Sequence, residues 1–276
     1  FLKPGRSITV VFDCSGGTAS LVLRELFRKE SGVRAIIING RQRDLVRAIR
    51  SRRADLGVLF DADGDRALFF DGRGTPIPHD VIAALLAHET RGSLMLDVRF
   101  GYLAALLLRG RHIIRTPVGG IYIKMRMRQR NVHFAAEYSG HYYFSDFFFC
   151  ESGILAAIKV INRISRVRNF EAWLDKLHRF CRSPEINVHP VRDRGTLPAL
   201  AVSNWVKRRY GKLAARIDLT DGIRLEFKNP DWWISVRPSN TEPLVRLNLE
   251  AKDPAVYRAK LRAIKKMLLA MKLHED

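Results

Sequence analysis

The sequence has few cysteines and no long apolar run. Its three cysteines, Cys14, Cys150 and Cys181, form no CxxC pair and lack the spacing of a zinc site. Scattered thiols of this kind are typical of the reducing cytosol, so we expect a cytoplasmic protein without a disulfide framework. No apolar run approaches the roughly 18–20 residues of a membrane span, and we therefore expect no membrane partner.

The sequence is also short of acidic residues. Lysine and arginine number 48 against 28 aspartates and glutamates, which gives a formal net charge of +20. A surplus of this size attracts phosphorylated metabolites, nucleic acids and anionic membranes alike. The basic residues are spread along the chain without a nucleic-acid-binding motif, and the densest cluster, 124–130, is typical of a solvated helix face. We therefore do not expect nucleic acid to be the partner.

What the sequence does contain is enough apolar residues for more than one core. Hydrophobic residues make up 47% of a chain of 276 residues, a length that accommodates two or three domains. The sequence opens with Phe1-Leu2-Lys3-Pro4-Gly5, which is neither an initiating methionine nor a signal peptide. From this opening we expect an upstream part to be missing.

Strand-like and helix-like segments alternate along the first two thirds of the sequence. Ile8–Phe12 is β-branched and aromatic, whereas Ser20–Lys29 has apolar residues at helical spacing. The alternation continues to a helix-like segment at Phe170–Phe180, and it predicts layered α/β domains. Pro184 and the hydrophilic segment Val191–Gly195 mark a boundary.

The remaining segment has a different pattern. Strand-like runs follow one another near 216–219, 223–227, 233–236 and 244–249. Helix-like segments at 200–210 and 255–271 flank them, which predicts a small α+β domain. The predicted fold class is therefore α/β, with domains at 1–75, 76–183 and 184–276.

The most distinctive local pattern is Asp61-Ala62-Asp63-Gly64-Asp65-Arg66, the aspartate loop, which follows the apolar run Leu56–Phe60. Three carboxylates at every second position repel one another unless a cation lies among them. A hard divalent ion such as Mg²⁺ takes oxygen ligands and relieves that repulsion. Gly64 lets the backbone bend around such an ion, and Arg66 is a fixed cation suited to a phosphate.

Three other interpretations compete for the aspartate loop. A calcium-binding EF-hand needs Gly at its sixth position and Glu at its twelfth, where this sequence has Arg66 and Gly72. The loop also resembles that of a haloacid-dehalogenase-type phosphatase, a family that expects Thr or Ser where Asp65 stands. A surface loop without a ligand is the third interpretation.

Two further loops carry polar residues beside strand-like runs. Arg237-Pro238-Ser239-Asn240-Thr241-Glu242-Pro243, the Arg237 loop, offers a phosphate a guanidinium fork, side-chain donors and backbone N–H groups. Glu137-Tyr138-Ser139-Gly140-His141, the Glu137 loop, places Glu137 and Ser139 in alternation, so both can face one hydroxylated ligand. Taken alone, each loop is also compatible with a polar turn, and His141 with a structural histidine.

In this order and spacing, the three loops resemble those of the phosphohexomutases of the phosphomannomutase/phosphoglucomutase type. The aspartate loop resembles that family's metal loop, the Glu137 loop its sugar-recognition loop and the Arg237 loop its phosphate-binding loop. The resemblance spans nearly the whole chain and implies the family's second, third and fourth domains. It further implies that the first two of these are three-layer αβα domains.

The resemblance implies an isomerase that interconverts hexose 1-phosphate and hexose 6-phosphate by Mg²⁺-dependent phosphoryl transfer. By motif match it implies Asp61, Asp63 and Asp65 as Mg²⁺ ligands, Arg66 beside the transferring phosphate, and Glu137, Ser139 and His141 at the sugar. It also implies that Arg237, Ser239, Asn240 and Thr241 hold the phosphate that is not reacting, and that Arg99 lies near the substrate. Asn240 favours mannose or glucose phosphate over glucosamine phosphate.

The resemblance breaks at the phosphoserine. That family's serine lies in a Thr-Ala-Ser-His-Asn-Pro loop of its first domain, whereas Leu21-Val22-Leu23 follows Thr18-Ala19-Ser20 in this sequence. We interpret Ser15–Thr18 as a loop that leads into a helix. We therefore expect the chain alone to bind metal and phosphosugar weakly without turnover, and a separate or missing phosphoserine domain to be its partner.

Smaller departures concern single positions. Gly120 stands where many relatives have His, Ala135 and Ala136 replace family glycines, and the connection from Ile38 to Arg43 is short. Two alternatives of other kinds stay open: a non-catalytic relative that binds a phosphosugar or polyanion, and the haloacid-dehalogenase-type phosphatase.

Overall fold

The computed structural model describes residues 2–28, 32–177, 180–189, 198–271 and 273–275. These residues form two compact units. The large unit comprises Phe1–Leu96, Ala104–Ile114 and Gly120–Leu177, and the C-terminal unit comprises Asp97–Leu103, Arg115–Gly119 and His178–Asp276. Two short segments that we predicted to belong to the middle domain thus group with the C-terminal unit. The division into three domains stays a prediction, and the Val191–Gly195 boundary lies outside the described residues.

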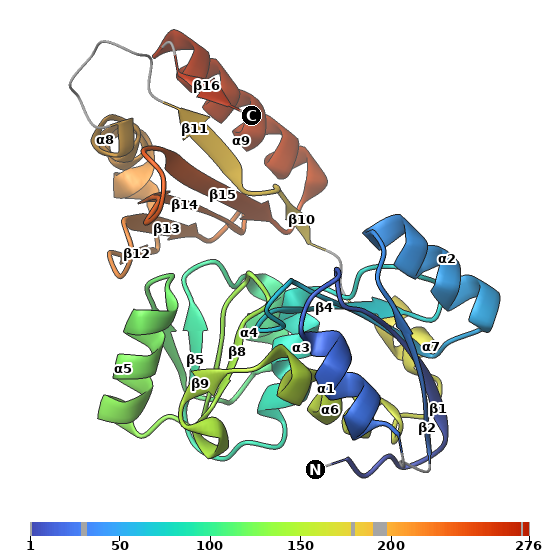
Figure 1. The fold of residues 1–276 in the computed structure, drawn as a ribbon. Coiled ribbons are helices and arrows are strands. Elements are labelled where there is room, and N and C mark those ends of the chain that lie inside the picture. Colours follow the sequence, from blue (N-terminus) through green and yellow to red (C-terminus); the bar gives the residue numbers. More distant parts are fainter. Residues whose placement is uncertain (1, 29–31, 178–179, 190–197, 272, 276) are drawn as a thin grey trace. The chain divides into compact units, whose positions relative to one another are not determined.

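The large unit begins with a four-stranded sheet in the order β2-β1-β3-β4. Its strands are β1 (Ile8–Asp13), β2 (Val33–Ile38), β3 (Leu56–Phe60) and β4 (Ala67–Asp71). β1 is parallel to β2 and β3, whereas β4 is antiparallel to β3. Helices α1 (Ala19–Leu26) and α2 (Gln42–Arg52) pack on this sheet (Figure 1). Leu45 and Ile49 of α2 pack with Val11, while Phe12 stacks on Phe27 just after α1.

A second sheet follows, in the order β6-β5-β7-β8-β9. Its strands are β5 (Leu94–Asp97), β6 (Ile113–Thr116), β7 (Phe134–Ala136), β8 (Tyr142–Phe144) and β9 (Cys150–Glu151). The helices of this part are α3 (His79–Ala87), α4 (Tyr102–Leu107), α5 (Gly120–Arg130), α6 (Gly153–Ile164) and α7 (Phe170–Asp175), and Ser145–Phe147 is a single 3₁₀ turn. Strands and helices alternate as predicted, which confirms the α/β class. The helix predicted over Phe170–Phe180 was too long, because α7 ends at Asp175 and Cys181 begins a strand.

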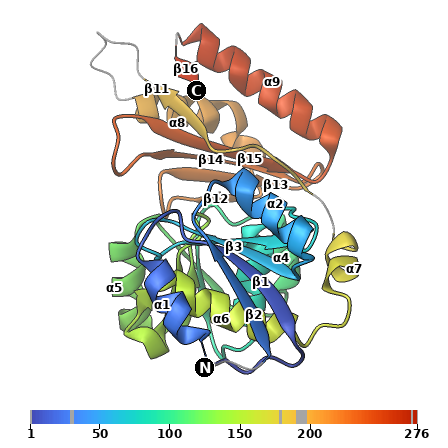
Figure 2. The same cartoon turned by 45° about the vertical axis from the view of Figure 1, so that its right-hand side comes forward.

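The C-terminal unit contains an antiparallel sheet in the order β12-β13-β14-β15-β11-β16, with β10 also beside β15. Its strands are β10 (Cys181–Arg182), β11 (Ile186–His189), β12 (Arg216–Asp218), β13 (Ile223–Phe227), β14 (Trp232–Pro238), β15 (Val245–Ala251) and β16 (His274–Glu275). Helices α8 (Pro198–Tyr210) and α9 (Pro254–Ala270) lie on the same face of this sheet (Figure 2), and a 3₁₀ turn at Gly211–Leu213 follows α8.

The two faces of the C-terminal sheet differ in chemistry. Every second residue of β14, such as Ile234 and Val236, packs with α8 and α9 in the apolar core. The residues between them, Trp233, Ser235 and Arg237, point to the opposite face and are also buried. Because side chains alternate along a strand, the opposite face gathers polar groups from β13, β14 and β15. This polar face is the part of the sheet that matters for function.

Within the described residues, no helix is both long and apolar enough to cross a membrane. All three cysteines are free thiols. Burial, helped by Asp13, raises the pKa of Cys14 to about 11, so this thiol stays protonated at neutral pH and is a core residue rather than a nucleophile.

Candidate functional site

The aspartate loop lies at the end of β3, where the structure brings its three carboxylates together. Asp61, Asp63 and Asp65 each offer an oxygen, and these oxygens all lie within 4.8 Å of one another. Gly64 adopts a φ of +75°, a conformation that a residue with a Cβ rarely takes, and so turns the chain between Asp63 and Asp65. The predicted grouping of the three aspartates is thus present in the structure.

The charges in the aspartate loop are only partly compensated by the protein. The Arg66 backbone N–H donates to Asp61 Oδ1 at 3.1 Å, and its guanidinium donates to Asp61 Oδ2. Although burial opposes the effect, these hydrogen bonds lower the pKa of Asp61. Burial and the neighbouring Asp61 raise the pKa of Asp65, whose Oδ1 is buried and accepts no hydrogen bond. A buried carboxylate oxygen without a donor fits a metal cation.

The segment before α1 packs against the aspartate loop, and Ser15 donates its hydroxyl to Phe60 O at 2.7 Å. Thr18 N donates to Ala62 O at 3.1 Å, and a Cβ at Gly17 would overlap that same carbonyl group. Ser20 lies in the first turn of α1, where its hydroxyl donates to Gly17 O at 3.0 Å. This agrees with our interpretation of 15–18 as a loop leading into a helix.

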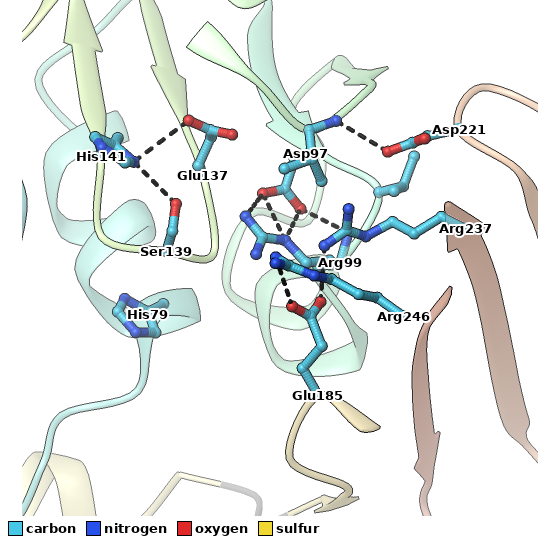
Figure 3. Close-up of polar contacts among 12 residues, drawn as sticks. His79, Asp97, Arg99, Glu137, Ser139, His141, Glu185, Asp221, Arg237 and Arg246 are labelled. Carbon is cyan, nitrogen blue, oxygen red and sulfur yellow. Dashed lines mark hydrogen bonds and ion pairs between the residues drawn. The ribbon is translucent and has the colours of Figure 1, made fainter. Parts of the chain in front are cut away.

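The Glu137 loop connects β7 to β8 in the same unit and touches the aspartate loop. Ala67 N donates to Gly140 O at 3.0 Å, so the two loops run side by side. The His141 ring lies between two carboxylates, with Nε2 3.4 Å from Asp65 Oδ2 and Nδ1 3.4 Å from Glu137 Oε2. Nδ1 also lies 2.9 Å from Ser139 Oγ (Figure 3). His141 therefore contacts carboxylates of both loops.

Glu137 is nearly buried and is held by a residue that the sequence analysis did not single out. Tyr143, in β8, donates its hydroxyl to Glu137 Oε2 at 2.6 Å. Burial and the adjacent Glu137 carboxylate raise the pKa of Tyr143, so it stays a donor. Lys124, in α5, pairs with Glu151 at 3.1 Å in the same unit.

The Arg237 loop joins β14 to β15 in the C-terminal unit. Arg237 is 1% exposed, and its Nη2 donates to Glu185 Oε1 at 2.9 Å. Arg246, its register partner on β15, donates from Nη1 to the other oxygen of Glu185 at 3.3 Å. The Nε atoms of Arg237 and Arg246 are buried without an acceptor in the described residues. Two guanidinium groups with unused donors have the chemistry that an anion requires.

The predicted residues beyond Arg237 have different surroundings. Ser239 Oγ accepts from Thr241 N at 3.4 Å, and both residues lie in the exposed turn. Asn240 Nδ2 donates to Val118 O at 2.8 Å, while Val118 N donates to Asp221 Oδ2 at 3.1 Å. The Asn240 amide therefore holds the 115–119 segment in place.

Arg99 belongs to the C-terminal unit as well. Its guanidinium is fixed by Asp97, with Nη2 2.7 Å from Oδ2 and Nε 3.1 Å from the same oxygen. Arg99 and Asp97 are both buried. In Figure 3 the guanidinium groups of Arg99, Arg237 and Arg246 point toward one another. The C-terminal unit thus gathers three arginines from three segments of the chain.

Sequence reasoning missed Arg246, Glu185 and Tyr143. Arg246 follows Glu242 by four residues and alternates with core residues of β15, so its position on the polar face was readable from the pattern. Glu185 offered no such signal, because it lies 52 residues from Arg237 in the sequence.

Comparison with known proteins matches two parts of the chain to models of one family. The model of phosphoglucomutase/phosphomannomutase α/β/α domain III matches residues 98–180, and the model of the C-terminal domain of that family matches 185–266. A phosphomannomutase of Escherichia coli is 34% identical over 82% of this chain and 50% of its own length. A probable phosphoglucosamine mutase of Methanobrevibacter smithii is 28% identical over 94% of this chain and 60% of its own.

A solved structure shares the fold. The phosphoglucomutase/phosphomannomutase family protein of Burkholderia thailandensis has a TM-score of 0.81 and 22% identity, over 98% of this chain and 62% of that one. This chain spans about half the length of the curated phosphomannomutases it matches. The matches favour the mutase interpretation over the phosphatase and the polyanion-binding relative. Together with the three loops, they show that the chain belongs to the phosphoglucomutase/phosphomannomutase family.

Proposed function

We propose that this chain supplies the metal, sugar and phosphate sites of a phosphohexomutase that interconverts hexose 1-phosphate and hexose 6-phosphate. The observation that carries the proposal is the contact between the aspartate loop and the Glu137 loop through His141. A carboxylate cluster for a cation and a loop of hydroxyl-binding groups lie side by side, as phosphoryl transfer to a sugar hydroxyl requires.

In this proposal Asp61, Asp63 and Asp65 hold Mg²⁺. The buried Asp65 Oδ1, which accepts no hydrogen bond, supports a hard cation at this place. When bound, the ion neutralises negative charge on the transferring phosphoryl group. Arg66 adds a fixed positive charge beside it. His141, in contact with both Asp65 and Glu137, is placed to hold the proton of the reacting sugar hydroxyl.

The proposed substrate contacts come from the Glu137 loop and from the Arg237 loop with Arg99. Glu137 and Ser139 accept hydrogen bonds from sugar hydroxyls. Asn240 favours mannose or glucose phosphate as the substrate. Arg99 and Arg237 hold the phosphate that is not being transferred, with Ser239, Asn240 and Thr241 in the turn beside it. The guanidinium groups of Arg99 and Arg237 match phosphate oxygens better than a lysine ammonium would.

The phosphoryl donor is the part that this sequence does not offer. Its only Thr-Ala-Ser, at 18–20, lies at the start of α1 with the Ser20 hydroxyl bonded to Gly17 O. We therefore propose that a phosphoserine domain acts together with these residues, and that the 276-residue chain alone binds but does not turn over. The free thiols agree with work in a reducing compartment such as the cytosol.

A calorimetric titration of mannose 1-phosphate with Mg²⁺ at physiological salt tests the proposal. We expect saturable binding that Arg237→Ala weakens about 10- to 100-fold, because hydrogen bonds to a charged group are lost. Arg216→Ala, an exposed arginine on β12, is the matched control and should bind like the parent chain. Equal binding by all three proteins would refute the phosphate site. Turnover by the chain alone, lost in Asp63→Asn, would refute the need for a separate phosphoserine.

A further inference from the structure

The polar face of the C-terminal sheet holds one fully buried cation, Arg224, whose role none of the loops explains. Arg224 lies on β13 beside Ser235 of β14 and is 2% exposed. Its Nη1 donates to two backbone carbonyl groups of the Asp97–Leu103 segment, Val98 O at 2.6 Å and Phe100 O at 3.0 Å. Its guanidinium carbon stands 3.7 Å from the centre of the Trp233 ring. Arg224 therefore holds the Asp97–Leu103 segment, which lies more than 120 residues away in the sequence.

Other groups of the sheet hold the same segment from both sides. Arg182 Nη2 donates to Arg99 O at 2.6 Å. Guanidinium groups therefore donate hydrogen bonds to three successive backbone carbonyl groups, at positions 98, 99 and 100. Glu250 Oε2 accepts from Tyr102 N at 3.1 Å. A Cβ at Gly101 would overlap the Glu250 carboxylate, which shows how closely the backbone approaches the sheet.

The buried charge of Arg224 is balanced by carboxylates on the same face. Its Nε donates to Glu226 Oε1 at 2.8 Å, and Arg115 donates to that oxygen and, at 3.0 Å, to Asp218. Burial, and next Arg115, lower the pKa of Arg224 to about 10, so the group is still a cation at neutral pH. A lysine has no planar fork that reaches two carbonyl groups and a carboxylate while stacking on an indole.

The fixed segment carries Arg99 at its centre. The Arg99 side chain is clamped to Asp97, and in Figure 3 it points to Arg237 and Arg246. We propose that Arg224 is a positioning residue: by holding the carbonyl groups on either side of Arg99, it keeps the Arg99 guanidinium in the anion site of the C-terminal unit. This rests on the proposed function, which assigns Arg99 and Arg237 to phosphate.

A double-mutant cycle separates positioning from general stability. Arg224→Lys keeps the charge and loses the fork, and Arg216→Lys on β12 is the matched control. We expect Arg224→Lys to weaken the binding of mannose 1-phosphate about tenfold in the parent chain. In an Arg99→Met background it should weaken binding less than twofold, because the group it positions is absent. An equal loss in both backgrounds would overturn the proposal.

Hydrogen–deuterium exchange tests the contact without any ligand. In Arg224→Lys, amides of 98–103 should exchange about tenfold faster, while those of β14 and β15 keep their parent rates. Unchanged exchange at 98–103 would overturn the proposal even if phosphate binding fell. Should the parent chain not bind the sugar phosphate at all, the proposed function fails at this site, and exchange alone decides whether Arg224 holds the segment. If Arg224→Lys does not fold, Gly101→Ala displaces the same segment and should give the same two results.

Discussion

The aspartate loop and the anion site of the C-terminal unit are opposite in charge and in what they leave unused. In the aspartate loop three carboxylates face one arginine, and Asp65 Oδ1, 3.9 Å from Arg66 Nε, is a buried acceptor that receives no hydrogen bond from the described residues. Around Arg237 the guanidinium groups face Glu185, and the buried atoms without a partner are donors, Arg237 Nε and Arg246 Nε.

This difference is the basis of the ligand that we propose for each site. A buried polar atom without a partner costs free energy, so its persistence points to a ligand that completes it. An unused acceptor among carboxylates calls for a cation, and unused donors on guanidinium groups call for an anion. The two sites together fit a metal and a phosphate.

The largest effect should come from the cation side. Asp65→Asn keeps the shape of the side chain but removes its charge, and we expect Mg²⁺ affinity to fall about 100-fold, the upper range for altered metal sites. Titration of Mn²⁺ followed by paramagnetic resonance measures this directly. Asp146→Asn is the matched control, since Asp146 is half exposed and pairs only with Lys159 among the described residues. Equal Mg²⁺ affinity in Asp65→Asn and in the control would refute the inference that the Asp65 carboxylate holds a cation.

The mirror experiment on the anion side is Arg246→Met. Arg246 is more exposed than Arg237 and shares its charge between Glu185 and Glu242. We therefore expect a loss of about tenfold in affinity for mannose 1-phosphate, near 1.4 kcal/mol, while Mg²⁺ affinity stays unchanged. Calorimetry with each ligand in turn separates the two. A loss of Mg²⁺ binding in Arg246→Met would show that the metal site and the anion site are not independent.

The sequence predicted the position of each loop because each follows a strand. Asp61 comes directly after β3, Glu137 after β7, and Arg237 near the end of β14. A change from apolar alternation to clustered polar residues is a local signal, and it marked all three loops. The grouping of Asp61, Asp63 and Asp65 was also local, since five residues contain it.

Partners that come from distant segments could not be predicted in the same way. The pair Arg237 and Arg246 depends on the register of β14 with β15, and a slip of one residue would send one of them to the apolar face. Glu185 depends on the path of the chain between β10 and β11, and Tyr143 on the short strand β8. Strands of two to four residues, such as β8 and β10, carry too little pattern to be recognised.

The smallest effect we expect concerns how folding stability depends on pH. The sign of this dependence should differ between the polar face of the C-terminal sheet and the aspartate loop. Burial alone would raise the pKa of Glu226, but Arg224 and Arg115 outweigh it and lower that pKa. For Asp218, hydrogen bonds from Thr220 and Arg115 likewise outweigh burial. A carboxyl with a lowered pKa binds fewer protons when folded, so its stabilisation is present above the unfolded pKa of about 4 and is lost as the pH falls through the folded value.

The contribution of Asp65 to stability has the opposite sign, because its pKa is raised in the folded state. Protonation of Asp65 in acid therefore relieves the charge repulsion within the aspartate loop. Urea unfolding followed by tryptophan fluorescence reports mainly on the C-terminal unit, since three of the four tryptophans, Trp205, Trp232 and Trp233, lie in it. We expect its midpoint to fall between about pH 5 and pH 3, and to fall less in Arg115→Met, where the partner that lowers both pKa values is gone. The control Arg258→Met, which changes an exposed arginine of α9, should keep the full pH dependence. The same slope in Arg115→Met and the parent chain would mean that the polar face of the C-terminal sheet does not hold its carboxylates charged, and the contrast with the aspartate loop would fail.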